Sequence, residues 1–280
     1  MRLGYLGPPG TFSEEALQAS PLAPGADLVP FASIHETVMA VDEGAVDRAL
    51  VPIENALEGG VTATLDALAD DARAVAIVGE AVLAIRNCLI ARRNLPLGDI
   101  VVVVSHPQPL GQCARFLRSE LPGAEVRTAS STAEAVRIVA DAPEPWAALG
   151  PRSAARRYDC AVLREGVDDD LDNATRFVWL GRPGSEPVGD DATRPWKTSV
   201  IFAGAGDAKP GWLVRCLSEF AFRGVNLTKI ESRPRRGRLG HYLFHVDLEG
   251  RSAEAAVADA VAALHAHCED VRVLGSYPAA

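Results

Sequence analysis

The sequence has few cysteines and no long apolar run. Its five cysteines are odd in number and scattered without a Cys-x-x-Cys pair, which indicates buried thiols and argues against a disulfide framework or a zinc site. Nowhere do about 18 uncharged apolar residues follow one another, so no membrane-spanning helix is predicted. The N-terminal residues enter a strand-like pattern without the apolar core of a signal peptide. We therefore expect a cytoplasmic protein without a bound metal.

Positive charge is also scarce, and little of it comes from lysine. The formal net charge is −9. Such a chain repels phosphate backbones, and the basic run at 233–238 is too short to form a nucleic-acid face, so nucleic acid is not an expected partner. Apart from Lys197, Lys209 and Lys229, every residue counted as positively charged is an arginine, which suits bidentate recognition of carboxylates.

The first 180 residues alternate short β-branched runs with amphipathic helical stretches, which is typical of α/β layering. Predicted strands lie at 2–6, 48–52, 100–104, 125–128, 146–149 and 177–180. Two Ser/Thr-x-x-Glu capping boxes, Thr11 with Glu14 and Ser33 with Glu36, predict helix starts. The stretch 74–91 is too long and too β-branched for one ordinary strand, and it suits a segment that passes between two lobes.

A domain boundary is predicted where the sequence turns to Pro, Gly, Asp and Ser. We expect a catalytic domain at 1–182, with a second lobe at roughly 77–160, a linker at 183–196 and a further domain at 197–280. The further domain reads as strand 197–203, helix 211–222, strands 227–233 and 241–248, helix 252–267 and strand 271–277. This βαββαβ order is the ferredoxin-like arrangement.

Polar groups gather where the predicted strands end. The turn at 7–13 opens a helix and offers Thr11 and Ser13 to an anion, or it is simply a capped turn. Glu54 and Asn55 follow one strand, and Ser105 follows another with Gln112 on the next helix; ligands bind at such strand ends in open α/β sheets. A Ser-His-Asp triad built on Ser105 is rejected, because the Gly-x-Ser-x-Gly turn is missing.

A fourth segment, Asn173-Ala174-Thr175-Arg176-Phe177, offers an amide, a hydroxyl and a guanidinium within five residues. Its arginine suits a substrate carboxylate and its threonine can donate to a reacting oxygen. In isolation, the segment equally fits a strand start with an exposed ion pair.

Together, the four segments resemble the signature stretches of prephenate dehydratases. The matching stretches are Gly-Thr-Phe-Ser-Glu-Glu-Ala at 10–16, Pro-Ile-Glu-Asn at 52–55, Ser-His-Pro-Gln at 105–108 and Thr-Arg-Phe at 175–177. The C-terminal part looks like an ACT domain, with the Glu-Ser-Arg-Pro motif of phenylalanine-regulated members at 231–234. The resemblance covers nearly the whole chain and implies two lobes like those of a periplasmic solute-binding protein, with the site between them.

The resemblance implies that prephenate loses carbon dioxide and water to give phenylpyruvate. Aromatisation drives the reaction, so no cofactor is expected. Thr175 is the family's essential hydroxyl, Arg176 is assigned to the side-chain carboxylate that stays, and Glu54, if buried in the closed site, is the rival proton donor. Asn55, Ser105 and Gln112 are expected as further catalytic residues, with Thr11, Ser13 and Phe177 at the substrate.

The resemblance also implies feedback by L-phenylalanine and at least a homodimer, or a homotetramer. The expected effector-binding residues come from three short segments: Gly211, Trp212, Leu213, Asn226, Glu231, Ser232, Arg233 and Pro234. The family usually has Gly-Ala-Leu where this chain has Gly211-Trp212-Leu213, and the tryptophan either fills the pocket or caps it.

Two other functions stay open on the sequence. Arogenate dehydratase, which acts on the amino-acid analogue of the same ring, would keep every motif. A non-catalytic two-lobed sensor or transport receptor would be expected to carry a signal sequence or a helix-turn-helix, and we find neither pattern in the sequence.

Overall fold

The computed structural model describes residues 1–189, 193–204, 209–235 and 240–280. The chain divides into two compact units, Met1–Thr37 with Glu54–Gly59 and Val82–Arg176, and Val38–Ile53 with Gly60–Ala81 and Phe177–Ala280. Residues 190–192 of the predicted linker and 236–238 of the basic run lie outside the described residues.

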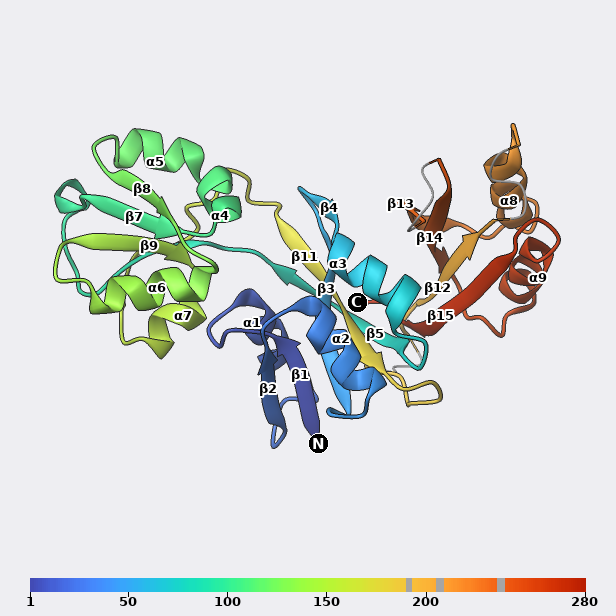
Figure 1. The fold of residues 1–280 in the computed structure, drawn as a ribbon. Coiled ribbons are helices and arrows are strands. Elements are labelled where there is room, and N and C mark those ends of the chain that lie inside the picture. The colour runs from blue at the N-terminus through green and yellow to red at the C-terminus, as the bar shows by residue number, and fades with distance from the viewer. Residues whose placement is uncertain (190–192, 205–208, 236–239) are drawn as a thin grey trace. The chain divides into compact units, whose positions relative to one another are not determined.

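Within the described part of the chain, the strands form three sheets (Figure 1). The first has the order β2 (Asp27–Phe31), β1 (Arg2–Leu6), β3 (Arg48–Asn55), β11 (Ala174–Gly181) and β5 (Ala76–Ala84), and β4 (Gly59–Gly60) pairs with β3. Its helices are α1 (Phe12–Gln18), α2 (Ile34–Asp42) and α3 (Thr62–Asp66), which continues into a π-helical turn, Ala67–Asp71. The adjacency of β3 and β11 brings together two segments that are more than 100 residues apart.

Both predicted capping boxes are present. The Thr11 hydroxyl accepts from the Glu14 backbone N–H at 3.4 Å, and the Ser33 hydroxyl accepts from that of Glu36 at 3.1 Å. In each case the glutamate side chain bonds the backbone N–H of the residue before the cap, Gly10 at 2.6 Å and Ala32 at 3.3 Å. These bonds satisfy helix-end amides that would otherwise lack partners.

The stretch 74–91 passes from the first sheet into the second, as its length predicted. It contains β5 and then β6 (Cys88–Ala91), which belong to different sheets. Beside this crossing, the buried Asp168 carboxylate accepts from the Asn87 backbone N–H at 2.7 Å and from its side-chain amide at 2.6 Å. Burial raises the pKa of Asp168 even though both bonds favour its charged form.

The second sheet, counted over the described residues, has five strands in the order β10 (Ala161–Arg164), β6, β9 (Trp146–Gly150), β7 (Val102–Ser105) and β8 (Glu125–Thr128). Helices α4 (Pro107–Gln112) and α5 (Ala114–Glu120) lie on one face, and α6 (Thr132–Asp141) and α7 (Arg152–Arg157) on the other (Figure 1). Neighbouring strand residues divide between the two faces: Ile90 packs with α6 and Leu89 with α5. Both faces are therefore buried, which explains the continuous β-branched runs.

The third sheet has the order β13 (Leu227–Pro234), β14 (Tyr242–Glu249), β12 (Trp196–Ala203) and β15 (Asp270–Pro278), and its paired strands are antiparallel. With α8 (Trp212–Ala221) and α9 (Ala255–Leu264) it forms the predicted βαββαβ domain, whose core includes Phe202, Phe220 and Phe244. On β15, Gly275 lies directly against the backbone of Ile77 on β5. The predicted fold class is confirmed, while the predicted domain boundaries stay predictions.

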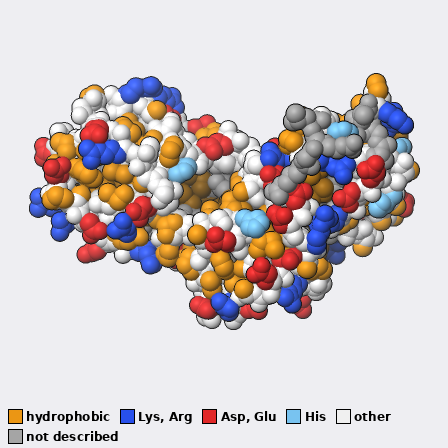
Figure 2. All heavy atoms as spheres, in the orientation of Figure 1, with side chains coloured by type: hydrophobic (Ala, Val, Ile, Leu, Met, Phe, Trp, Pro, Cys, Tyr) orange, Lys and Arg blue, Asp and Glu red, His pale blue; other side chains and the backbone are white. Residues whose placement is uncertain are grey.

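The visible face of the molecule mixes positive and negative side chains (Figure 2). No helix among the described residues is both long and apolar enough to cross a membrane. Over the same residues, no cluster of three or more His, Cys, Asp or Glu side chains is arranged to hold a metal ion.

Candidate active site

Asn55, the last residue of β3, connects polar groups that lie at the start of the neighbouring strand β11. Its side-chain N–H groups donate to the Thr175 hydroxyl at 3.0 Å, to Asn173 Oδ1 at 2.9 Å and to the Ala174 carbonyl at 3.3 Å. Its Oδ1 accepts from the backbone N–H groups of Leu57 and Glu58, at 3.0 and 3.2 Å. A flipped amide would turn its N–H groups toward these two donors, so the orientation of Asn55 is fixed.

This orientation determines what Thr175 can do. A threonine hydroxyl has one proton and two acceptor positions. Because Asn55 donates to Thr175 Oγ1, the oxygen is used as an acceptor, and the hydroxyl proton can point to a different group. Thr175 is therefore prepared to donate one hydrogen bond.

Asn173 extends the network to α4 beside the second sheet. This residue is 1% exposed, and its side-chain N–H donates to Gln112 Oε1 at 3.3 Å. The Gln112 side-chain nitrogen is buried and has no hydrogen-bond partner among the described residues. Gln112 also lines a cavity of about 540 Å³ with Glu58 and Gln108. A buried donor beside a cavity is suited to a polar ligand group.

Arg176 and Glu54 form an ion pair at the same strand ends. Arg176 Nε donates to Glu54 Oε2 at 3.0 Å, and the arginine side chain is 11% exposed against 35% for the glutamate. A guanidinium has five N–H donors in a planar fork, so one bond to Glu54 is compatible with a second carboxylate partner. Glu54 acts here as an acceptor.

The other predicted site residues are buried, and the hydroxyls of two of them donate to backbone carbonyls of the protein itself. The Ser105 hydroxyl donates to the Leu149 carbonyl at 2.7 Å, and that of Thr11 to the Leu6 carbonyl at 3.1 Å. Ser13 is buried on the first turn of α1, and Phe177 is 2% exposed on β11. Their roles at a substrate stay predictions.

Two residues of this region have contacts that the sequence did not indicate. Asn173 stood in the predicted segment without a role, although it joins Asn55 to Gln112. Glu14 completes a capping box, but its carboxylate also accepts from the Tyr5 hydroxyl at 3.2 Å, and burial together with this anion raises the pKa of Tyr5. The Glu14 carboxylate therefore already accepts from the backbone N–H of Gly10, within the turn where the sequence predicted an anion.

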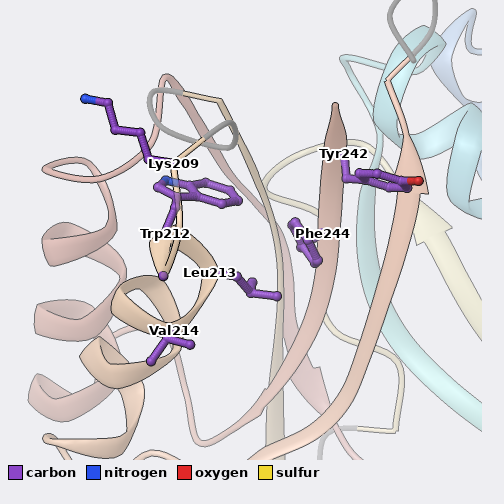
Figure 3. A pocket seen from close by; sticks show the side chains of 7 residues that line it. Lys209, Trp212, Leu213, Val214, Tyr242 and Phe244 are labelled. Atoms are coloured by element: carbon purple, nitrogen blue, oxygen red, sulfur yellow. The ribbon is translucent and has the colours of Figure 1, made fainter. Parts of the chain in front are cut away.

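A second candidate site lies at the start of α8. Gly211 has a φ of 77°, the left-handed conformation that glycine adopts without strain, and caps the helix. A pocket of about 220 Å³ is lined by Gly211, Trp212, Leu213 and Phe244, with the Leu213 side chain directed toward Phe244 (Figure 3). Its walls are mostly apolar, as for a small aromatic ligand.

Trp212 fills the core of its own domain. It is 4% exposed, its ring lies 6.0 Å from that of Phe202 and 5.9 Å from that of Phe244, and its indole N–H donates to the His267 carbonyl at 2.7 Å. The tryptophan therefore forms a wall of the pocket while anchoring α8 to the loop before β15.

The predicted effector residues on β13 divide between its two faces. Ser232 and Pro234 are exposed, whereas Glu231 and Arg233 are partly buried, as the alternation of a strand requires. Asn226, just before the strand, is exposed, and its carbonyl accepts from the Glu249 N–H at 3.0 Å. The structure therefore does not direct all these side chains to one site.

The family model, the curated relatives and several solved structures are described as prephenate dehydratases. A family model described as prephenate dehydratase matches residues 3–185. A prephenate dehydratase of Mycobacterium tuberculosis is 41% identical over 286 residues, which cover 99% of this chain and 87% of the relative. The solved prephenate dehydratase of Arthrobacter aurescens in complex with L-Phe is 39% identical, with a TM-score of 0.91 over 99% of this chain and 90% of that one. GqqA, described as a quorum quenching acylase, is 27% identical, with a TM-score of 0.85 over 100% and 98%.

Proposed function

The chain belongs to the prephenate dehydratase family. We propose that it converts prephenate to phenylpyruvate, carbon dioxide and water through the network of Asn55, Asn173 and Thr175, under feedback control by L-phenylalanine. The observation that supports this proposal most directly is the donation from Asn55 to Thr175 Oγ1 at 3.0 Å. Because Thr175 Oγ1 accepts this bond, the Thr175 hydroxyl proton points away from Asn55 and can be donated to the substrate.

The reaction breaks two bonds of the substrate ring. The bond to the ring carboxylate breaks, carbon dioxide leaves, and the electron pair moves through the ring to expel the hydroxyl at the opposite carbon. That hydroxyl takes up one proton, which comes from solvent in net terms, and leaves as water. Thr175 donates a hydrogen bond to the departing oxygen, where negative charge develops, and such a donor contributes about 10²–10³ in rate.

The remaining residues position the substrate. Arg176 binds the side-chain carboxylate that stays in the product, because a cation on the departing carboxylate would stabilise the ground state instead. Glu54 orients the guanidinium. The unpartnered Gln112 amide nitrogen donates to a substrate oxygen at the cavity edge.

Variants of Thr175 and Glu54 test this assignment. We expect Thr175→Ala to lower kcat by about 10²–10³-fold and Thr175→Ser to retain most of it, since serine keeps the hydroxyl. A general acid must be protonated, so a Glu54 acid would give a rate that falls with rising pH. If Glu54→Gln lost this pH dependence while Thr175→Ala stayed active, Glu54 and not Thr175 would be the proton donor.

Substrate choice requires a direct assay. We propose prephenate as the substrate, because the curated relatives are prephenate dehydratases. Purified protein should convert prephenate to phenylpyruvate faster than it converts arogenate to phenylalanine, and an N-acyl amide serves as counter-screen for the acylase activity of the GqqA relative. Faster turnover of arogenate would favour the alternative substrate.

For regulation, we propose that the third domain is an ACT domain and that L-phenylalanine binds in its 220 Å³ pocket, with Gly211 and Leu213 as lining residues. The Arthrobacter aurescens relative was solved in complex with L-Phe. Calorimetry should show binding of L-phenylalanine to the whole protein and should show weaker binding of L-tyrosine, whose hydroxyl would face an apolar wall. If calorimetry shows no heat of binding, this part of the proposal is wrong.

We also propose that the chain forms a cytoplasmic homo-oligomer through its third domain. Five large apolar side chains of that domain are 42–84% exposed: Val214, Phe222, Ile230, Tyr242 and Val273. Two of them, Val214 and Tyr242, line the effector pocket, so a second copy would cover it. The molar mass from light scattering should be that of at least a dimer, and the Ile230→Glu variant should have a molar mass closer to that of a monomer.

A further inference from the structure

β13 presents different chemistry on its two faces. Ser232 pairs with Phe244 of β14 and is exposed, whereas Lys229, Glu231 and Arg233 alternate with the exposed residues and are partly buried. Among the described strands, β13 is an edge strand of its sheet and pairs with β14 alone. Because alternate side chains of a strand are carried by one backbone, a displacement of that backbone moves the side chains of both faces.

The buried face of β13 contacts the segment Gly60 to Asp66. The Arg233 guanidinium donates two parallel hydrogen bonds to Asp66, from Nε at 2.9 Å and from Nη2 at 3.0 Å. The Glu231 carboxylate lies over Gly60, so close that a Cβ there would sit 3.0 Å from Glu231 Oε2. The bidentate Arg233–Asp66 pair fixes the position of β13 relative to α3. The Asp66 carboxylate also raises the pKa of Arg233.

That segment is in turn bound to β3. The Val61 N–H donates to the Ile53 carbonyl at 2.9 Å, and the buried Thr64 hydroxyl donates to the Pro52 carbonyl at 2.5 Å. The next two residues of the chain after Ile53 are Glu54 and Asn55. The contacts therefore lead from β13 through α3 to the strand end that carries the proposed active-site network.

We propose that Glu231 and Arg233 are not effector ligands but positioning residues that transmit effector binding to Glu54 and Asn55. This inference rests on the proposed function. Effector bound on the Ser232 side of β13 displaces the strand, the Arg233–Asp66 pair carries the displacement into α3, and β3 follows. The Glu-Ser-Arg-Pro motif thereby serves two functions, with Ser232 facing the effector side and the two charged residues facing α3.

The experiment separates binding from transmission in the whole protein. Arg233→Gln and Asp66→Asn each break the ion pair. We expect both variants to bind L-phenylalanine in calorimetry within about threefold of the unmodified protein, while the concentration for half inhibition of prephenate turnover rises at least about tenfold. The double variant Asp66→Arg with Arg233→Asp restores a pair of opposite charges and should recover part of the inhibition. Arg235→Gln, which alters a nearby ion pair with Glu269, is the matched control and should change neither measurement.

Two outcomes would overturn the inference while leaving the proposed function intact. Loss of L-phenylalanine binding in Arg233→Gln with Asp66→Asn unaffected would make Arg233 an effector ligand. Unchanged inhibition in both variants would show that the pair transmits nothing. If the unmodified protein binds L-phenylalanine without inhibition, or does not bind it, the regulatory part of the proposed function fails first. Unfolding curves recorded beside these assays identify a variant that has lost its fold. In that case, inhibition of the double variant Asp66→Arg with Arg233→Asp by L-phenylalanine decides whether the pair transmits the signal.

Discussion

The network around Asn55 makes a sharp prediction for the substitution Asn55→Asp, which changes one N–H₂ group to an oxygen and keeps the shape. The side chain is buried, and its amide nitrogen faces three acceptors, at 2.9, 3.0 and 3.3 Å. A carboxylate there leaves these acceptors without their donor. Each unpaired buried group costs about 1–3 kcal/mol, and rotation of the Thr175 hydroxyl relieves part of this cost, so we expect a loss of about 2–5 kcal/mol in the free energy of unfolding.

The rotation has a consequence for catalysis. The Thr175 proton turns toward the new carboxylate and is withdrawn from the departing oxygen of the substrate. We expect kcat at saturating prephenate to fall by about 10²–10³-fold, with a smaller change in KM, because Arg176 still binds the substrate. Acidic buffer should restore part of the rate, since a protonated carboxyl regains one donor.

Urea unfolding and steady-state kinetics measure the two effects. The exposed Asn226 provides a control for the same chemical change, and Asn226→Asp should alter the free energy of unfolding by less than about 0.5 kcal/mol. If Asn55→Asp kept kcat within about threefold of the unmodified enzyme and unfolded at the same urea concentration, the proposed role of Asn55 would be refuted.

Arg176, His245 and Trp212 offer three further tests. Arg176→Lys keeps the charge but loses the planar fork, so KM for prephenate should rise by about tenfold or more in steady-state assays. Burial lowers the pKa of His245 to about 4, so the unfolded chain takes up its proton first as pH falls; urea titrations should show a loss of about 2–3 kcal/mol between pH 7 and 4.5, which His245→Gln should abolish. Trp212→Phe leaves the His267 carbonyl without its indole donor and should lower the free energy of unfolding by about 1–2 kcal/mol in urea titrations, whereas an unchanged value would contradict the anchoring role.

Much of the fold could be predicted because its signals are local. Strand 2–6 agrees with β1 at both ends, and the capping residues Thr11 and Ser33 mark helix starts through bonds within four residues. Strands β2 and β10 were not among those predicted. Both lie at the edge of a sheet, and β2 contains Pro30, which a strand tolerates at an edge but which weakens the sequence pattern.

The site was only partly predictable, because its contacts join distant segments. Asn55 and Thr175 could each be named, but 120 positions separate them, and only the adjacency of β3 and β11 shows that one donates to the other. The division of β13 into two faces was implicit in its alternation. The partner of Arg233, however, is Asp66, which is 167 positions away, and no local sequence pattern predicts that pair.

Gly275 limits how this protein could be rebuilt. A Cβ at that position would overlap the carbonyl oxygen of Ile77, and backbone atoms cannot rotate away as a side chain can. The smallest possible side chain, that of alanine, is therefore enough to force β15 off β5. A chimera that joined this catalytic domain to the C-terminal module of another protein would need glycine at the equivalent place, and a library of hybrids screened for regulated activity should retain it.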